Sequence, residues 1–197
     1  MSDVLVLFDS RYGMTEALAR EVCHGVDSVT GMASRLRTVP AVSSTVDTRD
    51  AAVPESGPPY VENSDLAECA GLVLGSPTHF GNMTASLKYF FDNTVTEWLS
   101  GTLNGKPAGV FTSTSSLHGG QETTLLTMAV PLLHHGMIYV GLPYAEKALS
   151  TTTTGGSPYG ASHVSWSRES DSLSDDEKTL ARALGKRVAD IASRLGD

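Results

Sequence analysis

The chain has 197 residues, of which 40% are hydrophobic and 18% charged, a composition typical of a globular protein with a full core. Its 22 acidic residues outnumber 14 Lys and Arg residues, and the formal net charge of −8 argues against nucleic acid or an anionic membrane as a partner. Without an apolar stretch of ~18 residues or a signal peptide, the sequence favours a cytoplasmic protein. We expect one domain over residues 1–197, with Cys23 and Cys69 as free thiols in a reducing compartment.

Apolar runs and helical spacings alternate along the chain. The run 4–8 predicts a first strand, and Met14, Leu18, Val22 and Val26 recur every four residues, as in a helix. Further strands are predicted at 33–39, 71–75, from residue 109, and at 137–140. Arg35 and Arg37 indicate that the second strand lies at an exposed edge.

Three further helices are predicted. One carries Met83, Leu87, Phe90, Phe91 and Val95 on one side. The next spans 123–135, with Pro131 predicting a kink or a late start and Gly136 a C-cap. The last opens with Ser174 and Glu177 at the spacing of a capping box. Residues 40–64 and 150–172, rich in Pro, Ser, Thr or Gly, are predicted to be irregular connections.

Five strands with intervening helices predict an α/β fold: a doubly wound parallel sheet with helices on both faces, in three layers. Ligands of such sheets bind beyond the carboxyl ends of the strands. The segments that follow the strands are therefore the candidates for a functional site.

The segment after the first strand, 10–15, reads Ser-Arg-Tyr-Gly-Met-Thr and leads directly into a helix. Such a turn directs backbone N–H groups and the positive end of a helix at one point, where a phosphate would bind. Ser10 and Thr15 can add hydroxyl donors, and we expect Thr15 at an exposed helix start. Neither Gly-Lys-Ser/Thr nor G-x-G-x-x-G is present, which argues against an ATPase and against a dinucleotide fingerprint. An ordinary turn without a ligand is the alternative.

Two other loops are rich in small hydrogen-bonding residues. Residues 76–82 follow the third strand, and residues 112–121 follow the fourth. Both are expected at the same end of the sheet as residues 10–15, an arrangement that stability alone does not require.

These segments resemble the flavodoxin-like, FMN-binding quinone reductases, and most closely the WrbA-type NAD(P)H:quinone oxidoreductases. The resemblance rests on 10–15 and 75–83, and it is extended by Trp98, 119–122, 134–137 and 155–161. One departure is Ser115-Ser116-Leu117-His118, where the family usually carries a glycine-rich stretch, in a loop about one residue longer.

The resemblance implies a flavodoxin-like fold that binds FMN and transfers two electrons from NADH or NADPH to quinones, with ping-pong kinetics at one flavin face. It implies that the turn Ser10, Arg11, Tyr12, Gly13, Met14 and Thr15 holds the phosphate. The ring would be bordered by Pro77, Thr78, His79 and Phe80 on one edge and by Ser113, Thr114, Ser115, Ser116, Leu117, His118 and Gly119 on the other. It also implies dimers that associate into a homotetramer, with cavities bordered by neighbouring subunits.

The resemblance further implies that His134 contacts the cofactor and is catalytic, and that Tyr12 and Trp98 bind substrate. A histidine beside a quinone can donate a proton or a hydrogen bond to an oxygen that becomes anionic. The residues alone favour another interpretation, in which His134 is a histidine placed favourably at a helix C-terminus. On the same basis Trp98 reads as a partly buried core aromatic and Tyr12 as a solvent-facing turn residue.

Two other functions fit the same fold class. A one-electron carrier of the flavodoxin type would share the cofactor and the acidic charge. A phosphorylated receiver needs an Asp after the third strand, where Ser76-Pro77 stands, so the sequence argues against it. No His-x₃-His or paired-Cys spacing occurs, and we expect no metal site.

Overall fold

The computed structural model describes residues 2–42, 54, 56–165 and 172–196. Six parallel strands form one sheet: β1 (Ser2–Phe8), β2 (Met32–Thr38), β3 (Gly71–Pro77), β4 (Pro107–Thr114), β5 (Ile138–Tyr139) and β6 (Ala161–Val164). The helices are α1 (Met14–Asp27), α2 (Asn63–Glu68), α3 (Ala85–Asp92), α4 (Val95–Leu99), α5 (Gln121–His134), α6 (Ala148–Thr151) and α7 (Asp175–Leu195). Within the described residues, no helix is both long and apolar enough to cross a membrane.

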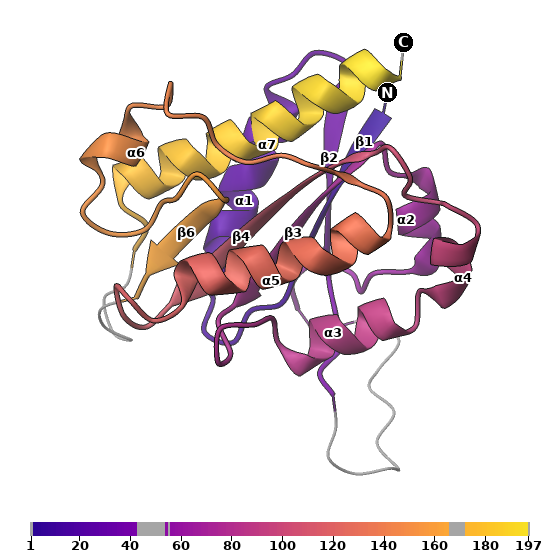
Figure 1. Cartoon of the computed structure of the whole chain (residues 1–197), viewed down its shortest axis with the longest axis horizontal. Helices are drawn as coiled ribbons and strands as arrows, with labels where there is room; N and C mark the ends of the chain where they lie inside the picture. The colour runs from indigo at the N-terminus through magenta and orange to yellow at the C-terminus, as the bar shows by residue number, and fades with distance from the viewer. Residues whose placement is uncertain (1, 43–53, 55, 166–171, 197) are drawn as a thin grey trace.

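The sheet is covered on both faces, as Figure 1 shows, with α1 and α7 on one side and α3 and α5 on the other. Strand β1 explains how one apolar run serves both layers. Val4, Val6 and Phe8 pack into the core under α1 and α7, whereas Leu5 and Leu7 pack into the core under α3 and α5. A strand buried on both faces reads as continuously apolar, which confirms the predicted three-layer α/β fold.

The strand order is β2-β1-β3-β4-β5, so β2 with its two arginines lies at an edge, as predicted. Both arginines are held in ion pairs rather than left in solvent. Arg35 pairs with Asp3, Asp65 and Glu68, and Arg37 pairs with Asp65. These contacts fasten α2 to the edge of the sheet.

The fifth position of the sheet differs from the prediction. Strand β5 has only two residues and pairs with the start of β4, at Pro107 and Ala108. Strand β6 lies within the segment predicted to be an irregular connection, and it pairs with the end of β4. The chain leaves β4 after Val140, where the Leu142 amide instead donates to the Pro158 carbonyl.

Three predictions about helices and connections also need correction. The helix expected to continue to Val95 ends at Asp92, because the Thr94 hydroxyl and the Asn93 amide donate to the carbonyls of Phe91 and Tyr89. Side chains of this kind compete with the backbone and favour a break. The segment 40–64 contains the first two residues of α2, and its residues 43–53 and 55 lie outside the described part. Helix α5 begins at Gln121, earlier than predicted, and runs through Pro131 to His134. Its C-cap is His135, and Gly136, the predicted cap, follows directly with φ 76°.

Candidate functional site

A pocket of about 260 Å³ lies where the strands β1, β3, β4 and β6 end. Its lining includes most of the residues predicted to bind a cofactor: Ser10, Arg11, Tyr12, Met14, Thr15, Pro77, Thr78, His79, Ser113, Thr114 and Ser115, together with Ser165. Residues as far apart in the sequence as Ser10 and Ser165 therefore meet at one pocket. The parallel topology produces this convergence, because all the strands point their carboxyl ends the same way.

The turn between β1 and α1 is shaped for an anion. Gly13 is the N-cap of α1 with φ 92°, a conformation that favours glycine, and as a glycine it offers the helix no side-chain cap of its own. The Ser10 hydroxyl accepts the Gly13 N–H at 3.1 Å and the Glu16 N–H at 3.4 Å, which fixes the turn. The backbone N–H groups at the start of α1, and with them the positive end of the helix dipole, thus face the pocket.

Thr15 joins this turn to the sheet. Its Oγ1 lies 2.8 Å from the Ser113 Oγ at the end of β4, and the two residues are only 1% and 8% exposed. The expectation that Thr15 lies at an exposed helix start was wrong. Helix α1 packs over the sheet from its first turn, which buries the Thr15 side chain against β4.

The segment after β3 forms the opposite wall. The Thr78 N–H donates to the Ser113 carbonyl at 2.9 Å, and the Thr78 and Thr124 hydroxyls are hydrogen-bonded. Beyond it, His79 and Asn82 exchange two backbone hydrogen bonds in a tight turn. Phe80 sits at the tip of this turn, fully exposed and with φ 54°. A non-glycine residue at positive φ costs conformational energy, so the turn presents its aromatic ring at a cost in stability.

The segment after β4 contributes less to the pocket than predicted. Ser115 lines it, whereas Ser116, Leu117 and His118 are exposed on the loop and Gly119 is partly buried before α5. The loop is held by the Thr114 hydroxyl, which donates to the Ser116 carbonyl at 2.9 Å. Residues 116–119, which were predicted to border the ring, are therefore not part of the lining of this pocket.

The charges around the pocket suit a phosphate. Arg11 lines it and stacks over the Tyr12 ring at 5.5 Å, and no carboxylate is among the described residues of the lining. Hydroxyls, amide N–H groups and one guanidinium are the donors that phosphate oxygens accept from. The donor set therefore fits the terminal phosphate of a flavin mononucleotide.

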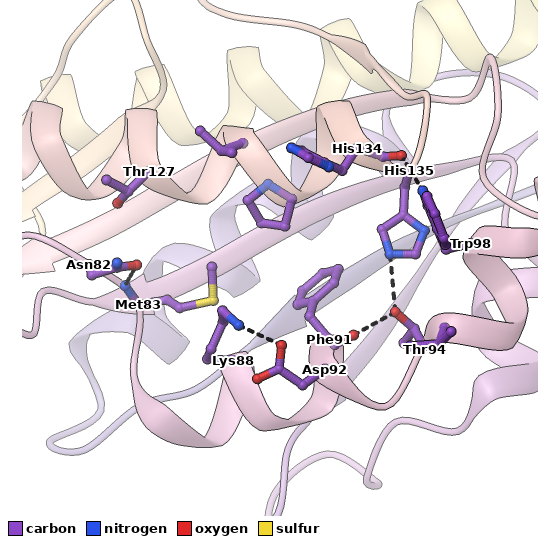
Figure 2. Close-up of a pocket in the computed structure, with 13 residues that line it drawn as sticks. Asn82, Met83, Lys88, Phe91, Asp92, Thr94, Trp98, Thr127, His134 and His135 are labelled. Carbon is purple, nitrogen blue, oxygen red and sulfur yellow. Dashed lines mark hydrogen bonds and ion pairs between the residues drawn. The ribbon is translucent and has the colours of Figure 1, made fainter.

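His134 and Trp98 lie elsewhere. They line a second cavity of about 460 Å³ between α3, α4 and the C-terminal half of α5, together with Asn82, Met83, Lys88, Phe91, Asp92, Thr94, Val95, Thr127, Val130, Pro131 and His135 (Figure 2). Helix α5 starts beside the first pocket at Gln121 and ends at His134. At 1.5 Å per residue, His134 is about 20 Å along the helix from its start. The fold of this chain therefore does not bring His134 and the first pocket together.

The second cavity is held by hydrogen bonds across its wall. The Trp98 indole N–H donates to the His134 carbonyl at 2.8 Å, and the His135 Nε2 lies 3.1 Å from the Thr94 hydroxyl (Figure 2). Burial lowers the pKa of His135 below its ordinary value, although the charge of Glu97 opposes this shift. The neutral form of His135 is favoured, and His134 is the exposed member of the pair.

Ser165 was missed by the sequence reasoning. It follows β6, a four-residue strand within a Ser/Thr/Gly-rich segment, and its N–H donates to the Thr114 carbonyl at 2.7 Å. The run Ala161–Val164 was the only signal, and four residues with two polar members are a weak one. No three His, Cys, Asp or Glu side chains gather in a metal-binding group in the part of the chain that the structure describes.

Comparisons with known proteins place the chain in a family. Residues 4–150 match the family model described as NADPH-dependent FMN reductase. A protein of Solidesulfovibrio magneticus named NAD(P)H dehydrogenase (quinone) is 42% identical, over 98% of each chain. A protein of the same name from Chromohalobacter salexigens is 42% identical, over 99% of each.

Solved structures agree on the fold. A flavodoxin, WrbA-like protein from Agrobacterium tumefaciens superposes with a TM-score of 0.69 at 22% identity, covering 98% of this chain and 99% of that one. A flavodoxin from the domain Archaea gives 0.64 at 17% identity, covering 97% and 99%. The sheet is thus flavodoxin-like, and the chain belongs to the NADPH-dependent FMN reductase family.

Proposed function

We propose that this protein is an FMN-dependent NAD(P)H:quinone oxidoreductase, which reduces quinones to hydroquinones by two electrons. The observation that carries the proposal is the first pocket, where a helix N-terminus with a glycine N-cap, buried hydroxyls and Arg11 converge, and where the described lining has no carboxylate. Membership of an FMN reductase family and relatives named NAD(P)H dehydrogenase (quinone) support the same reaction. They favour a reductase over a flavodoxin-type electron carrier.

The residues of the pocket divide into two roles. Ser10 to Thr15, with Ser113 behind them, hold the phosphate. Thr78 and His79 on one side, and Thr114 and Ser115 on the other, border the isoalloxazine. When bound, FMN supplies the redox chemistry by taking two electrons from NAD(P)H and passing them to the quinone. Fixed N–H and O–H dipoles from these loops favour negative charge on the ring without reorganising.

NAD(P)H and quinone share one face of the ring in turn. The described residues form one sheet with one phosphate-type turn, and no second nucleotide-binding fold is present among them. The exposed Tyr12 and Phe80 offer aromatic surfaces beside the pocket on which flat substrates can stack. The enzyme therefore binds the second substrate only after the first product has left.

A second subunit completes the site. Exposed apolar side chains surround the second cavity: Val95, Trp98 and Leu99 from α4, and Leu126, Val130 and Leu133 from α5. Such a face is costly in water and is typical of a protein–protein interface. We propose that subunits pair through it into dimers and then tetramers. His134 and Trp98 of one subunit then reach the ring held by another, where His134 hydrogen-bonds the quinone oxygen.

We also propose a cytoplasmic location and a single domain. Cys23 and Cys69 are free and buried, which supports a reducing, cytoplasmic compartment. Residues 1–197 are proposed to form one domain, because both helical layers share a single sheet.

The test is the absorption spectrum of the purified protein, followed by turnover. Protein supplied with FMN should show the two visible flavin bands and should oxidise NAD(P)H in the presence of a benzoquinone. Flavin binding without quinone reduction would instead favour the carrier. The absence of flavin binding would refute the proposal.

A further inference from the structure

Glu177, on the first turn of α7, is a carboxylate buried to 1% exposure. Its Oε1 accepts the N–H groups of Gly155 at 2.9 Å and Val164 at 3.2 Å. Its Oε2 accepts the Ser174 N–H at 2.8 Å and the His163 Nδ1–H at 3.0 Å. Burial alone would raise the pKa of Glu177, but the bonds from His163 and the backbone lower it to about 2.

A capping box uses only part of this arrangement. It requires the Ser174 hydroxyl to accept the Glu177 N–H and the Glu177 side chain to accept the Ser174 N–H, and both bonds are present. The three bonds from Gly155, His163 and Val164 reach beyond the helix. They join α7 to the loop after α6 and to β6.

Strand β6 connects these bonds to the first pocket. In the register of the sheet, His163 lies opposite Ser113 and Val164 opposite Thr114, and Ser165 follows directly. Ser113, Thr114 and Ser165 line the pocket, and Ser113 also contacts the buried hydroxyl of Thr15. One carboxylate is therefore hydrogen-bonded to the strand that pairs with Ser113 and Thr114 in the wall of the first pocket.

We propose that Glu177, together with His163, is a positioning residue for the phosphate of the cofactor. It fixes β6 against β4 and so holds the hydroxyls of Ser113 and Ser165 at the distance that the phosphate requires from the N-terminus of α1. This inference rests on the proposed FMN site. Preorganised donors bind an anion more tightly than mobile ones, because no free energy is spent on ordering them.

Glu177→Gln tests the inference, because the amide keeps the size of the side chain but replaces one acceptor by an N–H donor. Ser174→Ala is the matched control, since it removes the bond to the Glu177 N–H and leaves the carboxylate bonds in place. FMN and riboflavin are titrated into each full-length apoprotein by flavin fluorescence. Hydrogen exchange of the amides at 162–165 reports on β6.

We expect Glu177→Gln to weaken FMN by about tenfold, the size of one lost charge-assisted hydrogen bond, and riboflavin by less than about twofold. Exchange at 162–165 should accelerate. Ser174→Ala should keep the wild-type ratio of the two affinities. An FMN affinity within about twofold of wild type, or an equal loss for FMN and riboflavin, would overturn the positioning role.

A second pair of variants tests the inference if Glu177→Gln does not fold. His163→Ala is compared with His163→Gln, whose side-chain amide can still donate to Glu177. Partial recovery of FMN binding in the second variant supports the proposal, and equal loss in both contradicts it. If the wild-type apoprotein binds FMN and riboflavin equally well, the proposed phosphate site is refuted. This result is distinct from one in which only the positioning role of Glu177 is refuted.

Discussion

Replacing Thr15 by Val removes one hydroxyl from the buried contact between α1 and β4 and keeps the size of the side chain. Two losses follow. The Ser113 Oγ, 2.8 Å away and buried, loses its partner, which costs about 1–3 kcal/mol of the free energy of unfolding. The phosphate loses one donor to a charged group, which costs about 1–3 kcal/mol of FMN binding, or roughly 5- to 150-fold in Kd.

Thr112→Val is the matched control. Thr112 is fully buried on the same strand, and its hydroxyl donates to the Ser76 carbonyl at 2.8 Å, but it does not line the first pocket. The control should therefore lose a similar free energy of unfolding in urea, about 1 kcal/mol, and keep the wild-type Kd for FMN. Riboflavin binding should change little in either variant.

The two variants separate binding from stability. Unfolding is followed by circular dichroism of the apoprotein, and binding by quenching of flavin fluorescence. A folded Thr15→Val protein with an unchanged Kd for FMN would show that residues 10–15 do not hold the phosphate. Equal weakening by Thr112→Val would show that general destabilisation, rather than a lost contact, causes the effect.

Three further predictions concern catalysis and stability. His134→Ala should slow the half-reaction with quinone by up to ~10²-fold in stopped-flow experiments and leave the half-reaction with NAD(P)H nearly unchanged. If the variant reacts with quinone at the wild-type rate between pH ~5 and ~8, His134 has only a structural role at the end of its helix. Initial rates measured against NAD(P)H and a benzoquinone should give parallel double-reciprocal lines, and intersecting lines would refute the shared face. Because the pKa of Glu177 falls from 4.5 to about 2 on folding, its contribution to stability is present above pH 4.5 and is lost as the pH falls toward 2. In Glu177→Gln the melting temperature should therefore fall less steeply as the pH is lowered through this window. Asp175→Asn, at an exposed carboxyl of the same turn, is the control and should keep the wild-type profile. A wild-type acid profile in Glu177→Gln would contradict the stabilising role of the ionised Glu177.

Much of the fold was predictable because its signals are local. The apolar runs of β1, β3 and β4 are buried on both faces, and such runs are readable without any knowledge of their neighbours. The same holds for the pocket, since parallel strands bring the segments after them to one edge. The resemblance then supplied the cofactor that the turn at 10–15 only suggested.

The rest depends on contacts between distant segments. Strand β6 becomes extended by pairing with the end of β4, so its four residues carry no strong signal of their own. The burial of Thr15 depends on Ser113, ninety-eight positions away. The separation of His134 from the first pocket was predictable from the sequence. A helix that begins beside the pocket and runs for 14 residues ends far from it.

The central claim is that the first pocket holds the phosphate of FMN. Titration of the wild-type apoprotein with FMN and with riboflavin tests it most directly, because the two ligands differ only in that group. We expect FMN to bind much more tightly than riboflavin, and added inorganic phosphate to compete with FMN for the pocket. Equal affinities for the two flavins, unaffected by phosphate, would contradict it.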